Sequence, residues 1–342
     1  MSNTASTRRR GLRHAIPLLE LLALGATLVA PLLMRAAPEL VTLATNILIL
    51  SMLALSFELC WGYSGIMSFG QALYFGVAGY VVALVGRDLQ FSHAWVTLPL
   101  AMLVGLLLSL LFATFLLLGR RAPTVIFVSL GTLTGAYAAE RLVSGWQYVG
   151  AGNGLSSVKL LQIGPWEMVE GPAFYYFVLA LLLVCYGASR YVVRSQFGLV
   201  LAGMRQNEER LAFFGYRIQV FKALIFSFSG LLAGLGGALF AYHQGFIGPG
   251  NMGPGLSTTA VLYALFGGSG TLIGPVIGVA LIETISYVLA DQDTIKQYWP
   301  VILGAVLLAV VVFKPTGIVG FFVSRRERFG SYGGHVDRKH KE

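Results

Sequence analysis

Residues 197–239 read FGLVLAGMRQNEERLAFFGYRIQVFKALIFSFSGLLAGLGGAL, a polar segment that runs into a long apolar helix rich in small residues. Connections between membrane spans are usually short turns, whereas this polar segment has a helical composition. Arg205, Glu208 and Glu209 are spaced to crowd one face of a helix. Gly215 suits the left-handed position after a helix end. The pattern predicts a short exposed helix that docks on a partner; a solvated connecting loop is the alternative.

The composition is that of a polytopic membrane protein. The 342 residues are 56% hydrophobic and only 11% charged, whereas soluble domains carry about 25% charged residues. The expected fold is therefore all-α, a bundle of membrane-spanning helices. Cys60 and Cys185 fall in or at the end of apolar runs, so we expect them to be packing residues rather than a disulfide.

The apolar runs predict about ten membrane crossings, and eight remain possible. A membrane domain at 15–318, which contains the polar segment at 195–221, lies between basic tails at 1–14 and 319–342. Uninterrupted runs long enough to span, or nearly so, occupy 15–34, 41–61, 65–86, 94–118, 123–141, 173–193, 221–242 and 298–313.

Two regions predict broken or re-entrant helices, near 62–80 and 256–275. The apolar run at 256–267 is shorter than the roughly 20 residues that a full span needs. We therefore expect 256–290 to hold a half-length helix, a break and a further span. This region turns back through the membrane if the count is ten.

The basic residues predict the orientation, because Lys and Arg gather on the cytoplasmic side of membrane proteins. With both termini in the cytoplasm, the outer side holds few of the 24 basic residues, namely Arg35, Arg87, Arg141, Lys159 and Lys296. The formal net charge of +9 is thus explained by membrane topology. No segment resembles a nucleic-acid-binding module, so nucleic acid is not an expected partner.

The first candidate pathway region is WGYSGIMSFGQALYFGVAGY at 61–80. Its glycines disfavour a continuous helix, and irregular backbone at membrane depth must be buried in protein or line a cavity. The candidate pathway residues here are Gly62, Ser64, Gly65, Ser68, Gly70 and Gln71. The alternative is that the glycines only allow close helix packing.

The second candidate region is GGSGTLIGP at 267–275, with candidate pathway residues Gly268, Ser269, Gly270 and Thr271. It is not a phosphate-binding loop, because the chain contains no Gly-Lys dipeptide. Gly274 and Gly278 have the spacing of a close helix contact. Glu283 lies near the middle of the following span, where a carboxylate faces the bundle interior or water, and is a further candidate for the pathway or for an interhelical contact.

Catalysis is not indicated by any residue pattern. The five histidines fall in tails or at span edges without ligand spacing, and the motifs of metalloproteases, serine hydrolases and paired carboxylates are missing from the sequence. We therefore expect no enzyme activity, no metal site and no cofactor bound by this chain. A polytopic membrane enzyme would need acidic residues or histidines clustered at one interface.

The polar segment resembles the cytoplasmic coupling segment of ABC-importer permeases, specifically of the high-affinity branched-chain amino-acid (leucine/isoleucine/valine) type. The matching positions are Arg205, Asn207, Glu208, Ala212, Gly215, Phe221 and Lys222. The resemblance implies that the coupling segment, 195–221, docks on an ATPase subunit through Arg205, Asn207, Glu208, Glu209, Ala212 and Gly215. It extends over about 46–320 and includes the glycines at 62–70, the GGSGT sequence and an outer loop with Gly152, Asn153 and Gly154. The family often has histidine at the position of Gln71, which leaves the substrate open.

The resemblance also implies the partners and the location. It predicts a permease subunit in a bacterial inner membrane, paired with a second, paralogous permease and two ABC ATPases that bind ATP and Mg²⁺. A periplasmic substrate-binding protein would meet the loop at 152–154, and membrane lipid would surround the spans. Branched-chain amino acids are the expected solutes. Urea or short amides, or an ion-coupled secondary transporter that needs no ATPase, are the alternatives.

Overall fold

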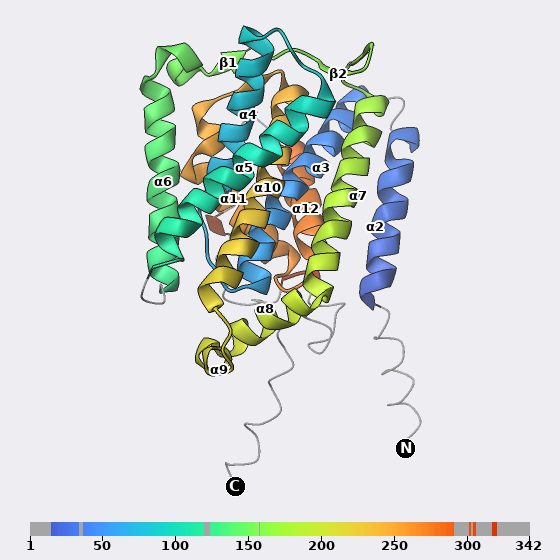
Figure 1. The fold of residues 1–342 in the computed structure, drawn as a ribbon. Coiled ribbons are helices and arrows are strands. Elements are labelled where there is room, and N and C mark those ends of the chain that lie inside the picture. The colour runs from blue at the N-terminus through green and yellow to red at the C-terminus, as the bar shows by residue number, and fades with distance from the viewer. Residues whose placement is uncertain are drawn as a thin grey trace, which may run out of the picture.

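The computed structural model describes residues 15–33, 37–119, 124–156, 158–290, 301, 304–305 and 317–319. Its long helices are α2 (Ala15–Leu33), α3 (Pro38–Glu58), α4 (Gln71–Asp88), α5 (Ala94–Leu116), α6 (Val125–Gly145), α7 (Pro172–Arg194) and α10 (Ile218–Gln244). Shorter helices are α8 (Gln196–Gln206), α9 (Glu208–Phe213), α11 (Pro254–Gly267) and α12 (Ile273–Ala290). The long helices run side by side, and α8 and α9 project from one end of the bundle (Figure 1).

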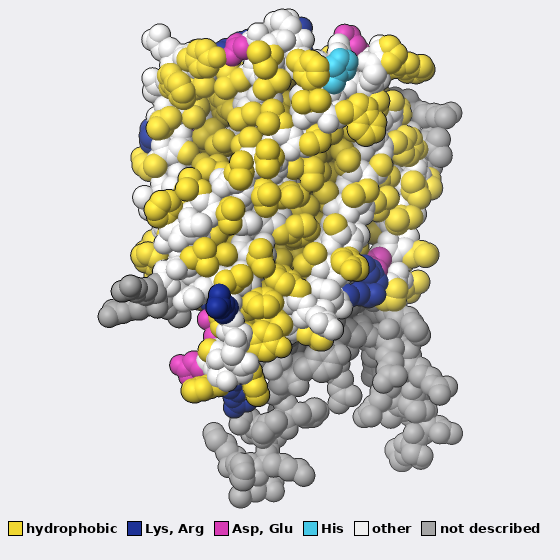
Figure 2. All heavy atoms as spheres, viewed as in Figure 1, with side chains coloured by type: hydrophobic (Ala, Val, Ile, Leu, Met, Phe, Trp, Pro, Cys, Tyr) yellow, Lys and Arg dark blue, Asp and Glu magenta, His cyan; other side chains and the backbone are white. Residues whose placement is uncertain are grey.

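The predicted all-α membrane fold is confirmed. Within the described residues, four helical segments are long and apolar enough to cross a membrane, namely Pro38–Tyr63, Ala94–Leu116, Pro172–Arg194 and Ile218–Gln244. On the face shown in Figure 2, hydrophobic side chains cover the middle of the molecule, and charged side chains gather at its two ends. This distribution fits a lipid-covered surface between two aqueous ends.

Helix α10 forms the centre of the bundle and packs against α3, α4 and α5. In the most apolar 18-residue stretch of α10, 78% of the residues are buried, whereas 33% are buried in the corresponding stretches of α5 and α7. Close approach is possible because the facing residues are small: the Gly234 backbone lies against Gly105 of α5, and Gly237 lies against the Phe75 backbone of α4. The interface of small residues is typical of helices that associate in lipid.

Helix α3 does not end at Glu58 but continues as a π-helical turn, Leu59–Tyr63. Gly65 then adopts a left-handed conformation with φ +75°. The Ile66 N–H donates to the Cys60 carbonyl at 2.9 Å, and the Gly65 N–H donates to the Trp61 carbonyl at 3.2 Å. Each bond spans one residue more than in a Schellman motif, because the preceding turn is π-helical, and together they satisfy carbonyls at the helix end. Residues 64–70 that follow are non-helical and are called the first break below.

The first break is shorter than the sequence predicts. The broken helix expected near 62–80 is present, with its break at 64–70, and helix α4 is continuous from Gln71 to Asp88. Gly76 and Gly79 are there for packing: added methyl groups would overlap Met252 and the Gly237 carbonyl oxygen. The packing alternative therefore holds for these two glycines.

The predicted half-length helix followed by a break is confirmed at 254–290. Helix α11 has 14 residues, and 268–272, the second break, connects it to α12. Helix α12 returns along α11, with Gly278 against the Tyr263 carbonyl and the Gly267 nitrogen, as the spacing of Gly274 and Gly278 predicts. The predicted span at 298–313 lies mostly outside the described residues, so the count of ten crossings stays a prediction.

The end of the bundle opposite α8 and α9 carries short strands (Figure 1). Strand β1 (Leu155–Ser156) pairs antiparallel with β4 (Phe246–Ile247), and β2 (Leu161–Ile163) pairs antiparallel with β3 (Trp166–Met168). The β1–β4 pair joins the long loop after α6 to the segment after α10. The loop between α6 and α7, which contains residues 152–154, is therefore partly ordered into β-ribbons and short 3₁₀ turns at Gln147–Val149 and Ala151–Asn153.

Candidate functional site

The coupling segment folds as two helices, α8 and α9, rather than one. Asn207 separates them: its backbone is extended, and its side-chain oxygen accepts the Arg210 N–H at 3.0 Å as the N-cap of α9. The expectation that Arg205, Glu208 and Glu209 share one helix face is therefore wrong. Arg205 belongs to α8 and the two glutamates to α9, because the asparagine side chain competes for the backbone at 207.

The charged residues of the coupling segment differ in their surroundings. Glu208 accepts an ion-pair contact from Lys222 of α10 at 2.7 Å, and the Lys222 side chain is only 8% exposed. Glu209 is exposed. Arg205 turns toward the bundle, where its guanidinium donates to the Gly62 carbonyl oxygen. Of the predicted docking charges, Arg205 and Glu209 are thus exposed, and Glu208 is partly buried.

Two aromatic residues at the tip of α9 form an exposed apolar surface that the charge pattern does not reveal. Phe213 is 90% exposed and Phe214 is 81% exposed. They lie between Ala212, which is exposed, and Gly215, which turns the chain with φ +85° as predicted. Adjacent phenylalanines in an otherwise polar segment are the sequence signal that could have identified this surface.

The polar residues in the first break and directly after it are buried within the chain. Ser64, Ser68 and Gln71 are each no more than 2% exposed. The Gln71 amide donates to Cys60 Sγ at 3.3 Å and to Ser229 Oγ at 3.4 Å, and its oxygen accepts from Ser56 Oγ at 3.2 Å. Gln71 therefore connects α3, α4 and α10.

Helix α6 supplies hydrogen-bond partners for the backbone of the first break. The Phe69 N–H donates to Thr132 Oγ1 at 3.0 Å, and Ser129 Oγ donates to the Met67 carbonyl at 3.2 Å. Ser68 Oγ accepts the Gly70 N–H at 3.2 Å. Irregular backbone at membrane depth needs such partners. Thr132 and Ser129 were not predicted from the sequence, because nothing in it shows which helix faces the break.

The second break is built on glycines with positive φ. Gly268 has φ +122° and Gly270 has φ +88°. Thr271 Oγ1 donates to the Gly268 carbonyl at 3.1 Å, which closes the turn locally. Ser269 is partly exposed, whereas Gly268, Gly270 and Thr271 are buried.

The two breaks and the coupling segment meet at the end of α3. The Glu58 side chain is fully buried there, and its Oε1 accepts the Gly270 N–H at 2.5 Å. One turn farther, Gly62 accepts from Arg205. Glu58 is thus enclosed within the bundle rather than exposed at its surface. The predicted residues at 62, 205 and 270 thus form one cluster.

Glu283 makes interhelical contacts. The Tyr263 hydroxyl of α11 donates to its Oε1, and Asn46 Nδ2 of α3 lies 3.4 Å from its Oε2. Of the two predicted roles, the observed contacts match the interhelical one. The structure does not bring Glu283 into the cluster at Glu58.

The loop at 152–154 lies at the end opposite the coupling segment. Gly152 and Asn153 are exposed, whereas Gly154 packs against the backbone of β4 and has φ +70°. Arg87 and Asp88 at the end of α4 hold the neighbouring turn: Arg87 donates to the Tyr148 carbonyl at 2.8 Å, and the Tyr148 hydroxyl donates to Asp88 at 2.5 Å.

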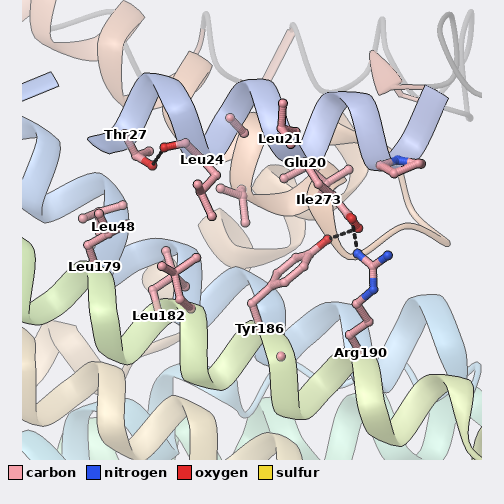
Figure 3. Close-up of a pocket in the computed structure, with 15 residues that line it drawn as sticks. Glu20, Leu21, Leu24, Thr27, Leu48, Leu179, Leu182, Tyr186, Arg190 and Ile273 are labelled. Carbon is pink, nitrogen blue, oxygen red and sulfur yellow. Dashed lines mark hydrogen bonds and ion pairs between the residues drawn. The ribbon is translucent and has the colours of Figure 1, made fainter. Parts of the chain in front are cut away.

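A crevice of about 380 Å³ separates the middle of α2 from α7 (Figure 3). Aliphatic side chains such as Leu24, Leu179 and Leu182 line it. Glu20 closes one end by accepting from the Tyr186 hydroxyl at 2.7 Å and pairing with Arg190. Among the described residues, no group of three or more acidic, His or Cys side chains could hold a metal ion.

Comparison with known proteins supports a transport role. The pattern of a family described as "Branched-chain amino acid transport system / permease component" matches residues 39–311. The chain is 23% identical over 304 residues to the high-affinity branched-chain amino acid transport system permease protein LivM of Salmonella typhimurium, covering 82% of this chain and 69% of LivM. It is 32% identical over 254 residues to the autoinducer 2 import system permease protein LsrC of Escherichia coli, covering 69% of this chain and 68% of LsrC. No solved structure matches the chain.

Proposed function

Because the chain belongs to the family of branched-chain amino acid transport system permease components, we propose that it forms, with a second permease, the solute pathway of an ATP-driven importer. It is an ABC-type transport subunit and a multi-pass membrane protein, not an enzyme. In this proposal ATP and Mg²⁺ bind to two ATPase subunits, and a periplasmic binding protein delivers the solute. Family membership also removes the reason to consider an ion-coupled transporter.

The observation that carries the proposal is the projecting pair of helices α8 and α9. Their tip exposes Phe213 and Phe214 to solvent, and aromatic anchors of this kind dominate the binding energy of protein interfaces. The same helices are attached to the bundle through Lys222 and through the Arg205 contact with Gly62. An element that is apolar at its tip and fixed at its base suits docking on a partner that moves.

The proposed orientation places this element in the cytoplasm, where ATPase subunits reside. The charge distribution supports it, since most of the basic residues then lie inside, with both termini. The opposite end, with the exposed Gly152 and Asn153, would face the periplasm of a bacterial inner-membrane importer and its binding protein.

The proposed substrates are branched-chain amino acids, as for LivM. LsrC belongs to an autoinducer 2 import system, so a solute that is not an amino acid is the second candidate, and urea and short amides remain within the same class of small polar solutes.

The test is reconstitution of the tagged chain with its co-purifying subunits in proteoliposomes. We expect an ATPase and a second permease to co-purify, and radiolabelled leucine, isoleucine or valine to enter only with ATP and a binding protein. Parallel assays with autoinducer 2, urea and acetamide assign the substrate. Uptake driven by an ion gradient without ATP, or the failure of any ATPase to co-purify, would refute the proposal.

A further inference from the structure

The cluster at the end of α3 joins three segments that are far apart in the sequence. The Glu58 carboxyl group, which is fully buried, bonds the Gly270 N–H of the second break at 2.5 Å. Gly62 makes room for that carboxyl group, because an added methyl group would overlap it. The same glycine offers its carbonyl oxygen to Arg205 of α8.

Gly62 thus lies against the Glu58 carboxyl group and also accepts the hydrogen bond from Arg205. Arg205 is thus linked to the first break by a hydrogen bond to the turn that precedes it, and to the second break by way of Glu58. In the part of the chain that the structure describes, Glu58 Oε2 has no hydrogen-bond partner.

The coupling helices are built to move together. Leu201 and Met204 of α8 are buried, and Gly203 lets Leu211 of α9 pack closely against α8. The ion pair of Glu208 with Lys222 joins α9 to the start of α10. A displacement of α9 is therefore passed to α8, and so to Arg205.

The two breaks are the positions at which helix direction can change. Both lack a continuous ladder of helical hydrogen bonds, and both contain glycines with positive φ, Gly65 in the turn that opens the first and Gly268 and Gly270 in the second. Hinges are typically a few residues at element ends that absorb changes in backbone angle. Helix α4 follows the first break, and α12 follows the second.

We propose that Arg205 and Glu58 are the positioning residues that carry movement of the α8–α9 element to both breaks, so that α4 and α12 tilt together. This inference rests on the proposed function, since it requires an ATPase to move α9. Arg205 acts on the first break through the Gly62 carbonyl, and Glu58 passes the movement to Gly270. The Gln71 and Glu283 contacts lie outside this route and stay intact.

The test uses the complete reconstituted importer and measures solute taken up per ATP hydrolysed. We expect Arg205→Ala to co-purify with the ATPase but to lower this ratio by about tenfold, within the range of coupling changes that single residues produce. Arg205→Lys, which keeps one charged donor, should recover part of the ratio. Glu58→Gln, which keeps an oxygen to accept the Gly270 N–H, should fall between wild type and Glu58→Ala. Arg194→Ala is the matched control, because Arg194 is an exposed cation at the same end with no ion pair among the described residues.

The outcomes separate this inference from the proposed function. A purely structural role would lower uptake and hydrolysis in parallel and leave their ratio unchanged, which would overturn the inference. A ratio for Arg205→Ala within about twofold of that for Arg194→Ala would also overturn it. If Arg205→Ala does not assemble, the ratio of solute taken up to ATP hydrolysed, measured for Arg205→Lys and Glu58→Gln, tests the inference instead. Failure of the wild-type chain to bind an ATPase would instead refute the proposed function itself.

Discussion

Replacing Gln71 by methionine should destabilise the fold without changing the transported solute. The Gln71 side chain is 1% exposed and bonds Ser56, Cys60 and Ser229. Methionine has a similar length and volume but no amide, so Gln71→Met removes these bonds with little change in packing. The prediction treats Gln71 as a connection between three helices rather than as a solute ligand.

The size of the stability loss depends on which hydrogen bonds the partners of Gln71 keep. Ser56 Oγ still donates to the Leu53 carbonyl at 2.6 Å, and Ser229 Oγ still donates to the Phe226 carbonyl at 2.7 Å. No hydroxyl is therefore left without a partner. Interhelical hydrogen bonds in membrane proteins average about 0.6 kcal/mol each, so losing all three lowers the free energy of unfolding by about 2 kcal/mol, or roughly 30-fold in the folded-to-unfolded ratio.

The assay is reversible unfolding in mixed micelles with increasing SDS, followed by tryptophan fluorescence. Gln147→Met is the control, because Gln147 is an exposed glutamine in a turn outside the bundle and should shift the transition little. Uptake by the reconstituted importer should keep the wild-type order of preference among solutes. The reasoning is refuted if Gln71→Met is as stable as Gln147→Met, or if it alters solute preference, since Gln71 would then face the pathway.

Three further predictions address docking, packing and the α2–α7 contact. The double variant Phe213→Ala/Phe214→Ala should bind the ATPase about 30-fold or more weakly at unchanged stability. The control is Phe115→Ala, because Phe115 is 76% exposed on α5. Equal affinities of the two variants in a binding titration would contradict the prediction. Gly234→Leu should abolish the monodisperse peak in size-exclusion chromatography because the α5 backbone fills that space, whereas Gly187→Leu, with nothing within 4 Å, should elute as wild type. Glu20→Leu should lower the free energy of unfolding by about 2 kcal/mol by leaving Arg190 and Tyr186 without their carboxylate partner; an unchanged SDS transition would show that the contact is not stabilising.

The general architecture could be predicted because it depends on local properties. Apolar length predicts the spans, and the glycines at 65, 268 and 270 occupy positive-φ positions that disfavour other residues. Positions of side chains across the bundle could not be predicted. Glu58 bonds a backbone group 212 residues away, and only the packing of α3 against the second break brings them together. The division of the coupling segment at Asn207 could have been predicted, because asparagine is a preferred N-cap residue.

The polar residues of the breaks illustrate why a membrane sequence can suggest a pathway where the structure has a core. Serine, threonine and glutamine in an apolar span can face a solute, or they can satisfy irregular backbone and bond neighbouring helices. Ser68 and Thr132 accept backbone N–H groups of the irregular segment, whereas Gln71 bonds side chains of neighbouring helices. The residues that meet the solute in the proposed importer are therefore to be sought on faces that this chain leaves uncovered and the second permease completes. The buried breaks would then serve the movement of the pathway rather than its chemistry.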